Sequence, residues 1–269
     1  MEQESLNLPP VVSEKGGWPV HFLTGKNYLY QTLFCIQSLA IASAEQFQFV
    51  LIDDGSFDDR LIQRINIQLP GATIVTEGEI SENIQRLLPP EQYPNLHTKR
   101  KVYPHIKKLT DVHTLPENTW KLVLDSDMLF WHNPAEMIRW LQSPDQPLYM
   151  VDCQNSYGYS RKLMESLCGS SVKDLLNVGM IGLNSKLVDW ESIEKWIPLL
   201  EQQEGTSYYL EQALTAMLIG DSASARLDQS TYIVNPSERH IKNKEGVLHH
   251  YVDTSKAGYF NLAWKQVKQ

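Results

Sequence analysis

The sequence has few cysteines and no long apolar run. It contains three cysteines, Cys35, Cys153 and Cys168, with no C-x-x-C pair. An odd number without that spacing disfavours a disulfide framework or a cysteine-bound metal, so we expect buried free thiols in a reducing compartment. No segment approaches the roughly 20 apolar residues that a bilayer span needs, and we therefore expect no transmembrane segment.

Basic residues are also fewer than acidic residues. The 24 Lys and Arg residues are outnumbered by 32 Asp and Glu residues, which gives a net charge of −8 over 269 residues. Proteins that wrap phosphate backbones gain most of their affinity from clustered Lys and Arg, so we expect no nucleic-acid partner. The first residues, MEQESLNLPP, have neither a basic lead nor an apolar stretch and do not resemble a secretory signal. We therefore expect a cytoplasmic protein.

Apolar, β-branched runs alternate with segments of helical period, a pattern that predicts an α/β fold with a largely parallel sheet. Strands are expected at 20–24, 48–52, 72–76, 120–124, 147–151, 178–183, 231–234 and 247–252. Helices are expected at 28–43, 134–142, 189–203 and 208–219, and from near Phe57 with Ser56 as N-cap. The polar, proline-containing stretch between 77 and 119 is expected to form loops and short helices. No linker is evident, so residues 1–269 are interpreted as one domain, with 1–17 as a flexible or peripheral segment.

Acidic residues follow two of the expected strands. Asp53 and Asp54 open a D-D-G-S turn, and Asp125 and Asp127 flank Ser126 directly after an apolar strand. Open α/β sheets bind ligands at this edge, and residues two apart in extended chain point to the same side. Two such carboxylates suit Mg²⁺ or Mn²⁺ holding a diphosphate. The alternative is that they only cap a turn.

The segment KLVLDSDMLFWHNPAEMI and the D-D-G-S turn together resemble the nucleotide-sugar glycosyltransferases of the GT-A fold. The pattern is most similar to the retaining enzymes of family 8, the glycogenin- and galactosyltransferase-like group. LLNVGMIGL resembles the N-x-G segment of that family, YYLEQALTAML its acidic-Gln helix start, and HYVDTSKAGYF its H-x-x-G-x-x-K signature. The resemblance spans roughly residues 20 to 260. It implies a GT-A type, Rossmann-like sheet, mixed but mostly parallel and flanked by helices.

Carried over to this sequence, the resemblance makes Asp125, Asp127 and His250 the ligands of Mn²⁺ or Mg²⁺. A neutral imidazole suits Mn²⁺ better than Mg²⁺. The alternative for His250 is a half-buried strand histidine without a partner, and adjacent His249 is the ligand if the strand register is shifted by one. Lys256 falls on the lysine that neutralises the departing diphosphate.

The C-terminal segment departs from the family at one position. Asp253 stands where the family has glycine, which allows close approach to phosphate, and Gly258 is the alternative source of that approach. Asp152 ends another expected strand and could bind acceptor or sugar hydroxyls.

The resemblance also assigns donor binding and catalysis. Donor-binding candidates are Thr24, Gly25, Asp53, Asp54, Lys107, Lys108, Ser126, Asn177 and Gly179. Either Asp53 or Asp54 would read the uracil or ribose while the other shapes the turn, and Asn177 and Gly179 would line the sugar pocket. Glu211 and Gln212 are the catalytic candidates beneath the donor sugar; the alternative for Glu211 is a helix N-terminal acid. The run Lys99-Arg100-Lys101 is interpreted as a solvated loop face.

The function predicted is a metal-dependent transfer of a hexose from a nucleotide diphosphate, most simply UDP-hexose, to a hydroxyl of a glycan, lipid or small molecule. Retention of anomeric configuration is favoured, although the D-D-G-S turn is closer to inverting family 2. Two alternatives use the same residues. One is a haloacid dehalogenase-type phosphatase with Asp125 as nucleophile, in which GDSASA resembles the later metal motif but has Ala225 for its second acid. The other is a non-catalytic nucleotide-sugar binding module.

Overall fold

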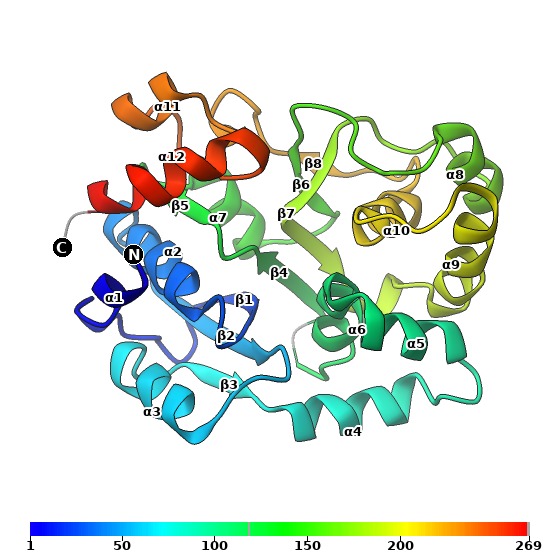
Figure 1. The fold of residues 1–269 in the computed structure, drawn as a ribbon, viewed down its shortest axis with the longest axis horizontal. Helices are drawn as coiled ribbons and strands as arrows, with labels where there is room; N and C mark the ends of the chain where they lie inside the picture. Colours follow the sequence, from blue (N-terminus) through cyan, green and yellow to red (C-terminus); the bar gives the residue numbers. More distant parts are fainter. Residues whose placement is uncertain (118, 268–269) are drawn as a thin grey trace.

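A mixed sheet forms the centre of the protein in a computed structural model that describes residues 1–117 and 119–267 (Figure 1). Its strand order is β3-β2-β1-β4-β7-β6-β8, and among the described strands of this sheet only β7 runs against its neighbours. The strands are β1 (Trp18–Thr24), β2 (Phe47–Asp53), β3 (Thr73–Val75), β4 (Trp120–Leu124), β6 (Leu148–Val151), β7 (Leu176–Asn184) and β8 (Ala225–Arg226). The mostly parallel α/β architecture predicted from the sequence is confirmed.

A smaller sheet lies at one end of the central one and has the order β5-β10-β9. Its strands are β5 (Met128–Phe130), β9 (Tyr232–Val234) and β10 (Leu248–His250). β10 runs antiparallel to β5 and parallel to β9. The smaller sheet therefore joins the chain just after β4 to a segment near the C-terminus.

Helices cover both faces of the central sheet. The α-helices are α1 (Glu2–Ser5), α2 (Leu29–Ala42), α3 (Asp59–Gln68), α4 (Glu77–Leu87), α5 (Pro94–Val102), α6 (Lys107–His113), α7 (Ala135–Gln142), α8 (Arg161–Cys168), α9 (Trp190–Glu204), α10 (Leu210–Ile219), α11 (Glu238–Asn243) and α12 (Lys256–Asn261). Short 3₁₀ helices are η1 (Pro104–Ile106), η2 (Ser185–Leu187), η3 (Asp253–Ser255) and η4 (Ala263–Gln266). None of the described helices combines the length and apolar character that a bilayer span requires.

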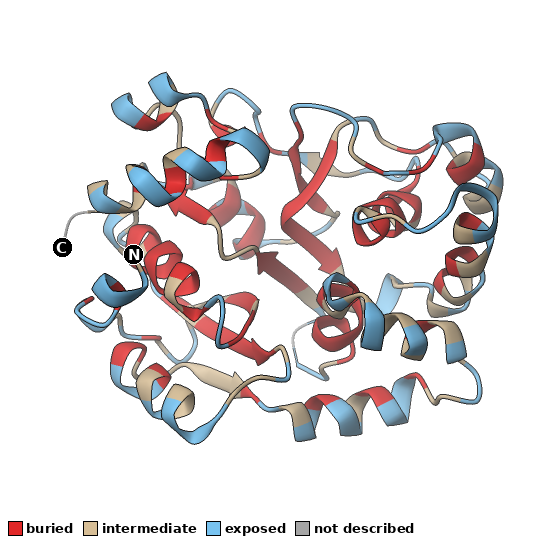
Figure 2. Ribbon diagram, in the orientation of Figure 1, coloured by how far each residue is buried: buried red, intermediate tan, exposed pale blue. Residues whose placement is uncertain are grey.

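Alternate side chains of the strands serve opposite faces of the sheet, as the pleat requires. In β2, Phe49 and Leu51 belong to the buried cluster that includes side chains of α2 and α7, whereas Val50 and Ile52 belong to the buried cluster that includes side chains of α4, α6 and α10. The strands are accordingly buried along most of their length (Figure 2). This two-sided core holds the strand ends, and the loops that follow them, in a fixed arrangement.

The expected strands are all present with small shifts at their ends, and so are the expected helices. The proline-containing stretch contributes α4, α5, η1 and α6. β5 and β8 were not expected, since strands of three and two residues are too short to show a period. The N-cap prediction was wrong: Asp58, not Ser56, caps α3 by accepting a hydrogen bond from the Leu61 amide.

The N-terminal residues lie beside α3 and β2. The Gln68 side chain donates to the Ser5 carbonyl at 2.7 Å, and the Phe49 amide donates to the Ser13 hydroxyl at 2.8 Å. The cysteines are all free, but only Cys35 is buried as expected; Cys153 is exposed and Cys168 is intermediate.

Candidate metal centre and its surroundings

Asp125, Asp127 and His250 meet at the carboxyl end of β4. The first two follow β4 directly, and the pairing of β10 with β5 places His250 opposite Met128, next to Asp127. The His250 Nε2 atom lies 3.4 Å from Asp127 Oδ1 and 3.6 Å from Asp125 Oδ2. The Tyr251 amide donates to the Asp127 carbonyl at 2.9 Å, which closes the pairing. The register of the β5–β10 pairing therefore brings His250 next to two aspartates that lie far earlier in the chain.

The donor atoms of these residues fit a divalent cation. They lie within 4.8 Å of one another and form the sole such cluster of His, Cys, Asp and Glu in the described part of the chain. An ion about 2.1 Å from each donor would set neighbouring donor atoms about 3 Å apart, slightly closer than they lie here. Two oxygens and one imidazole nitrogen suit Mn²⁺ or Mg²⁺, with the nitrogen favouring Mn²⁺. Asp221, from the GDSASA segment, is exposed and lies outside this cluster.

Charge pairing sets the protonation of this cluster. Burial opposes a charged imidazole, but the hydrogen bond and charge of Asp127, together with Asp125, raise the pKa of His250. Burial likewise opposes the Asp127 carboxylate, yet its contact with His250 lowers the pKa of that group. Since a metal ligand must present a free lone pair, cation binding here competes with the proton on His250 Nε2.

Of the adjacent lysines Lys107 and Lys108, it is Lys108 whose side chain lies against the metal cluster. It is buried, its Nζ atom lies 2.8 Å from Asp125 Oδ1 and 4.0 Å from Glu211 Oε2, and it donates to the Val178 carbonyl at 2.8 Å. Burial opposes its charge, but Asp125 and Glu211 raise the pKa of Lys108. Lys107 points elsewhere and donates to the Asp54 carbonyl at 2.6 Å. Lys108 thus contacts the carboxylates of Asp125 and Glu211, whereas Lys107 contacts the backbone of the D-D-G-S turn.

Glu211 and Gln212 lie buried at the start of α10. Burial raises the pKa of Glu211 to about 7, with Lys108 opposing and Asp125 adding to the rise. The Gln212 amide donates to the Ser156 carbonyl at 2.8 Å and to Asp152 Oδ2 at 3.4 Å. The Glu211 side chain can therefore gain or lose a proton near neutral pH, whereas the Gln212 side-chain amide is held in place by its two hydrogen bonds.

Asn177 and Gly179 lie behind His250 on β7. Asn177 Oδ1 is 3.1 Å from His250 Nδ1, and a Cβ atom on Gly179 would come within 2.4 Å of the imidazole ring. Asp152, at the end of β6, accepts a hydrogen bond from the Asn177 amide at 3.0 Å. Asp152 thus holds Asn177, and Asn177 and Gly179 lie against the His250 ring.

The D-D-G-S turn gives its two aspartates different surroundings. Asp53 Oδ1 accepts hydrogen bonds from the amides of Gly55, Ser56 and Phe57, so this carboxylate shapes the turn. Asp54 accepts from the Ser56 hydroxyl and lies over Gly25, where a Cβ atom would be 2.0 Å from Asp54 Oδ1. Glycine is therefore required at position 25 for Asp54 to lie at the end of β1.

A chain of hydroxyl groups supports the aspartate pair from the other side. Thr32, in α2, lies 2.8 Å from both the Thr24 and the Ser126 hydroxyl oxygens. Thr32 was not predicted from the sequence, because a buried threonine on an otherwise apolar helix face gives no signal of its own. Tyr103, which follows α5, was also not predicted; its hydroxyl donates to the Tyr208 carbonyl and accepts from the Glu211 amide.

The C-terminal segment brings one further cation to the cluster. Lys256 Nζ, half exposed, lies 4.0 Å from Asp127 Oδ2. Asp253 adopts a left-handed conformation with φ of 45°, the conformation that glycine at this position would adopt without strain. Gly258 instead packs against Ile241, where a Cβ atom would be 2.5 Å from Cδ1. The backbone at 253 thus keeps a glycine-like turn despite the substitution.

Two other predicted features lie away from the cluster. His249 accepts from Trp131 Nε1 at 2.9 Å and donates to the Glu245 carbonyl at 2.6 Å, so both of its ring nitrogens are engaged and it lies outside the cluster. The solvated loop expected at 99–101 is instead part of helix α5. Its Lys99 pairs with a glutamate of α9 at 2.5 Å, and its Arg100 with Asp111 at 2.7 Å.

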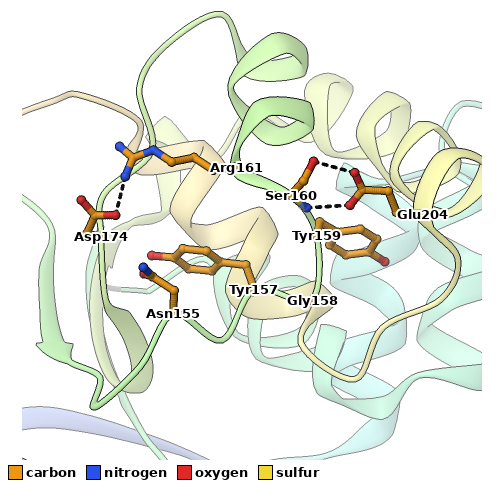
Figure 3. A pocket seen from close by; sticks show the side chains of 8 residues that line it. All are labelled: Asn155, Tyr157, Gly158, Tyr159, Ser160, Arg161, Asp174 and Glu204. Carbon is orange, nitrogen blue, oxygen red and sulfur yellow. Dashed lines mark hydrogen bonds and ion pairs between the residues drawn. The ribbon is translucent and has the colours of Figure 1, made fainter.

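A separate cavity of about 310 Å³ opens beside the loop after β6 (Figure 3). It is lined by Asn155, Tyr157, Gly158, Tyr159, Ser160, Arg161, Asp174 and Glu204. Its charged groups have partners within the lining: Arg161 forms an ion pair with Asp174, and Glu204 accepts hydrogen bonds from the Ser160 amide and hydroxyl. None of the metal-cluster residues lines it.

No protein-family model matches the chain, and no curated protein does. Solved structures do. A galactosyltransferase, LgtC, in complex with donor and acceptor sugar analogues, is 12% identical with a TM-score of 0.58, covering 88% of this chain and 87% of its own. Mouse xyloside xylosyltransferase 1 is 10% identical with a TM-score of 0.55, covering 90% and 98%. The glycosyltransferase GlyE of Streptococcus pneumoniae is 12% identical with a TM-score of 0.52, covering 93% and 62%.

Identities this low identify a shared fold rather than a shared reaction. The protein therefore has the GT-A fold of glycosyltransferases, as the sequence segments predicted.

Proposed function

We propose that the protein transfers a hexose from a nucleotide diphosphate, UDP in the first instance, to a hydroxyl acceptor, with Asp125, Asp127 and His250 holding Mn²⁺ or Mg²⁺. The observation that carries this proposal is the convergence of those residues at the ligand-binding edge of a GT-A sheet. Residues 1–269 are proposed to act as one such domain.

The surrounding residues have roles that follow from their charge and position. A bound divalent cation supplies Lewis-acid neutralisation of the diphosphate. Lys256 adds a mobile positive charge beside Asp127, where the leaving diphosphate gains negative charge. Glu211 and Gln212, buried at the start of α10, are proposed to hold the sugar. The acceptor oxygen bonds to the anomeric carbon as the bond from that carbon to the diphosphate breaks, the diphosphate keeping the electron pair, and the hydroxyl proton passes to an oxygen of the departing diphosphate.

The nucleoside is proposed to lie along the end of β1. Donor contacts are assigned to Thr24, Gly25, Asp54, Lys107 and Ser126. Asp54 is favoured over Asp53 as the group that reads base or ribose, because the backbone amides of the turn already occupy Asp53 Oδ1. Lys107 holds the Asp54 backbone and thereby fixes that loop.

A donor screen tests this function. UDP-, GDP- and ADP-sugars are incubated with the protein and Mn²⁺, and release of the free diphosphate is measured. We expect release from a UDP-hexose, loss of release in EDTA, and loss in Asp127→Ala. The matched control is Glu191→Gln, an exposed acid on α9 with a 3.9 Å contact to Lys195, which should release diphosphate like the wild type. Metal-independent release would contradict the metal assignment.

Retention of configuration is the part of the proposal that stands on the family 8 resemblance. An NMR time course with a turned-over donor and acceptor should show a product anomer of the same configuration as the donor. The opposite anomer would reject the retaining mechanism and leave the metal assignment intact.

A further inference from the structure

Asn177 contacts the metal cluster from behind, through His250. Its Oδ1 atom lies 3.1 Å from His250 Nδ1 and accepts a hydrogen bond from the Gly179 amide at 2.9 Å. Its Nδ2 atom donates to Asp152 Oδ2 at 3.0 Å. His250, Asn177 and Asp152 are all buried, so these bonds are shielded from competing water.

The partners of Asn177 fix which way its amide faces. A backbone N–H can only donate and a carboxylate can only accept, so the oxygen must face Gly179 and the nitrogen must face Asp152. The same oxygen faces His250, and it too can only accept. In the neutral ring the single proton is therefore held on Nδ1, so that Nε2, once it has given up its own proton to make way for a cation, faces Asp125 and Asp127 with a free lone pair.

Two further contacts hold this arrangement in place. Gly179 leaves room for the imidazole ring, since a Cβ atom there would come 2.3 Å from His250 Cε1 and 2.6 Å from Met128 Cε. Asp152, besides holding Asn177, accepts from the Gln212 amide at 3.4 Å. One carboxylate thus links the support of His250 to a residue proposed to hold the sugar.

We propose that Asn177 is a positioning residue for the metal: its Oδ1 atom keeps the His250 proton on Nδ1 and directs the Nε2 lone pair at the cation. This role differs from lining the sugar pocket, and it rests on the metal site of the proposed function. Groups that orient a metal-binding histidine in this way typically contribute 10- to 100-fold to metal affinity.

Mn²⁺ binding to the full chain, measured by calorimetry, tests the proposal without any donor or acceptor. We expect the Kd for Mn²⁺ to rise about 10- to 100-fold in Asn177→Ala. We expect a smaller rise in Asn177→Asp, whose carboxylate can still accept from Nδ1. A purely structural role predicts the opposite ranking, with Asn177→Asp the more damaging variant, since its new carboxylate would lie beside that of Asp152.

The tautomer gives a second readout that a structural role would not move. With diamagnetic Zn²⁺ bound, long-range ¹⁵N–¹H spectra of the wild type should show His250 protonated at Nδ1 and ligated through Nε2. In Asn177→Ala we expect this signature to weaken or to shift toward Nδ1 ligation. If Asn177→Ala fails to fold, Asn177→Asp carries both measurements.

Two glycines of β7 provide a matched pair. Gly179→Ala should displace the imidazole and weaken Mn²⁺ binding. Gly182→Ala should only disturb packing, because a Cβ atom there would meet Trp140 at 2.5 Å and no metal ligand. Equal Mn²⁺ affinity in the wild type and both Asn177 variants overturns the proposal. A wild type that binds no Mn²⁺ overturns the metal-dependent function itself, so the two failures are distinguishable.

Discussion

Lys108 joins the two acidic halves of the site. Its ammonium group lies between Asp125, a proposed metal ligand, and Glu211, and it is almost completely withdrawn from solvent. Burying a carboxylate costs free energy unless a counter-charge accompanies it, and Lys108 is the counter-charge for both. The residue therefore makes it possible to keep these acids together before any cation binds.

Removing this charge should destabilise the protein. We expect Lys108→Met to lower the free energy of unfolding by about 3 kcal/mol, because it removes the positive charge beside the buried Glu211 and the partly buried Asp125. Urea denaturation of metal-free protein measures the effect. Lys195→Met, which alters an exposed pair with Glu191, should change it by less than about 1 kcal/mol. Similar losses in both variants would show that Lys108 is not a buried counter-charge.

The elements around the site are joined by side chains as well as by sheet register. Thr32 of α2 links the end of β1, through Thr24, to the Ser126 hydroxyl of the aspartate turn. α2 also packs along β5, and its Ser38 hydroxyl accepts from the Phe130 amide at 2.9 Å. One helix thus positions both the nucleotide-side strand end and the metal-side turn.

Thr32→Val tests this link with little change in side-chain shape. It removes the shared hydroxyl and leaves the buried Thr24 oxygen without that partner, so we expect a loss of about 1 to 3 kcal/mol in unfolding free energy. Thr98→Val, on the exposed face of α5, removes a hydroxyl bonded only to the Pro94 carbonyl and should cost less. Indistinguishable urea midpoints would rule out a supporting role for Thr32.

The elements predicted from the sequence are those with a periodic apolar pattern. β2 and β4 are buried on both faces and contain short continuous apolar runs, FVLI and LVL, which is why their positions could be predicted. β5 is only three residues long and gains its partner from β10, over a hundred residues later, so no local pattern encodes it. The same limit applies to the site: aspartates after β4 are visible in sequence, whereas the contact between Asn177 and His250 depends on tertiary packing.

Several buried histidines, in different parts of the molecule, make the stability of the fold sensitive to acid. Burial lowers the pKa of His21 to about 4, that of His113 to about 3 and that of His249 to about 4. In each case the unfolded chain binds a proton below about pH 6.5 while the folded protein does not. Glu211 and His250 act in the opposite sense, because their pKa values are raised.

Stability should therefore fall as the pH drops from about 6.5 toward 4. Over that range each of these histidines stays neutral in the folded protein but takes up a proton in the unfolded chain, which favours unfolding by up to about 3 kcal/mol per group. The raised pKa values of Glu211 and His250 offset part of this loss of stability. Urea denaturation in EDTA at pH 7.0 and 4.5 measures the difference. We expect the loss to be about 2 kcal/mol smaller in His113→Gln. An unchanged pH dependence in that variant would contradict the assignment.

The antiparallel pairing of β5 with β10 has a consequence for how the molecule is made. Asp127 and His250 are roughly 120 residues apart in the chain, so the cluster cannot exist until almost all of the polypeptide has been synthesised and β10 has docked. A cation that bridges them would bind the folded chain and not the unfolded one, so its binding free energy would add to the stability of the fold. Metal uptake would then report the completion of folding, and nascent chains that lack β10 would carry both aspartates without their imidazole.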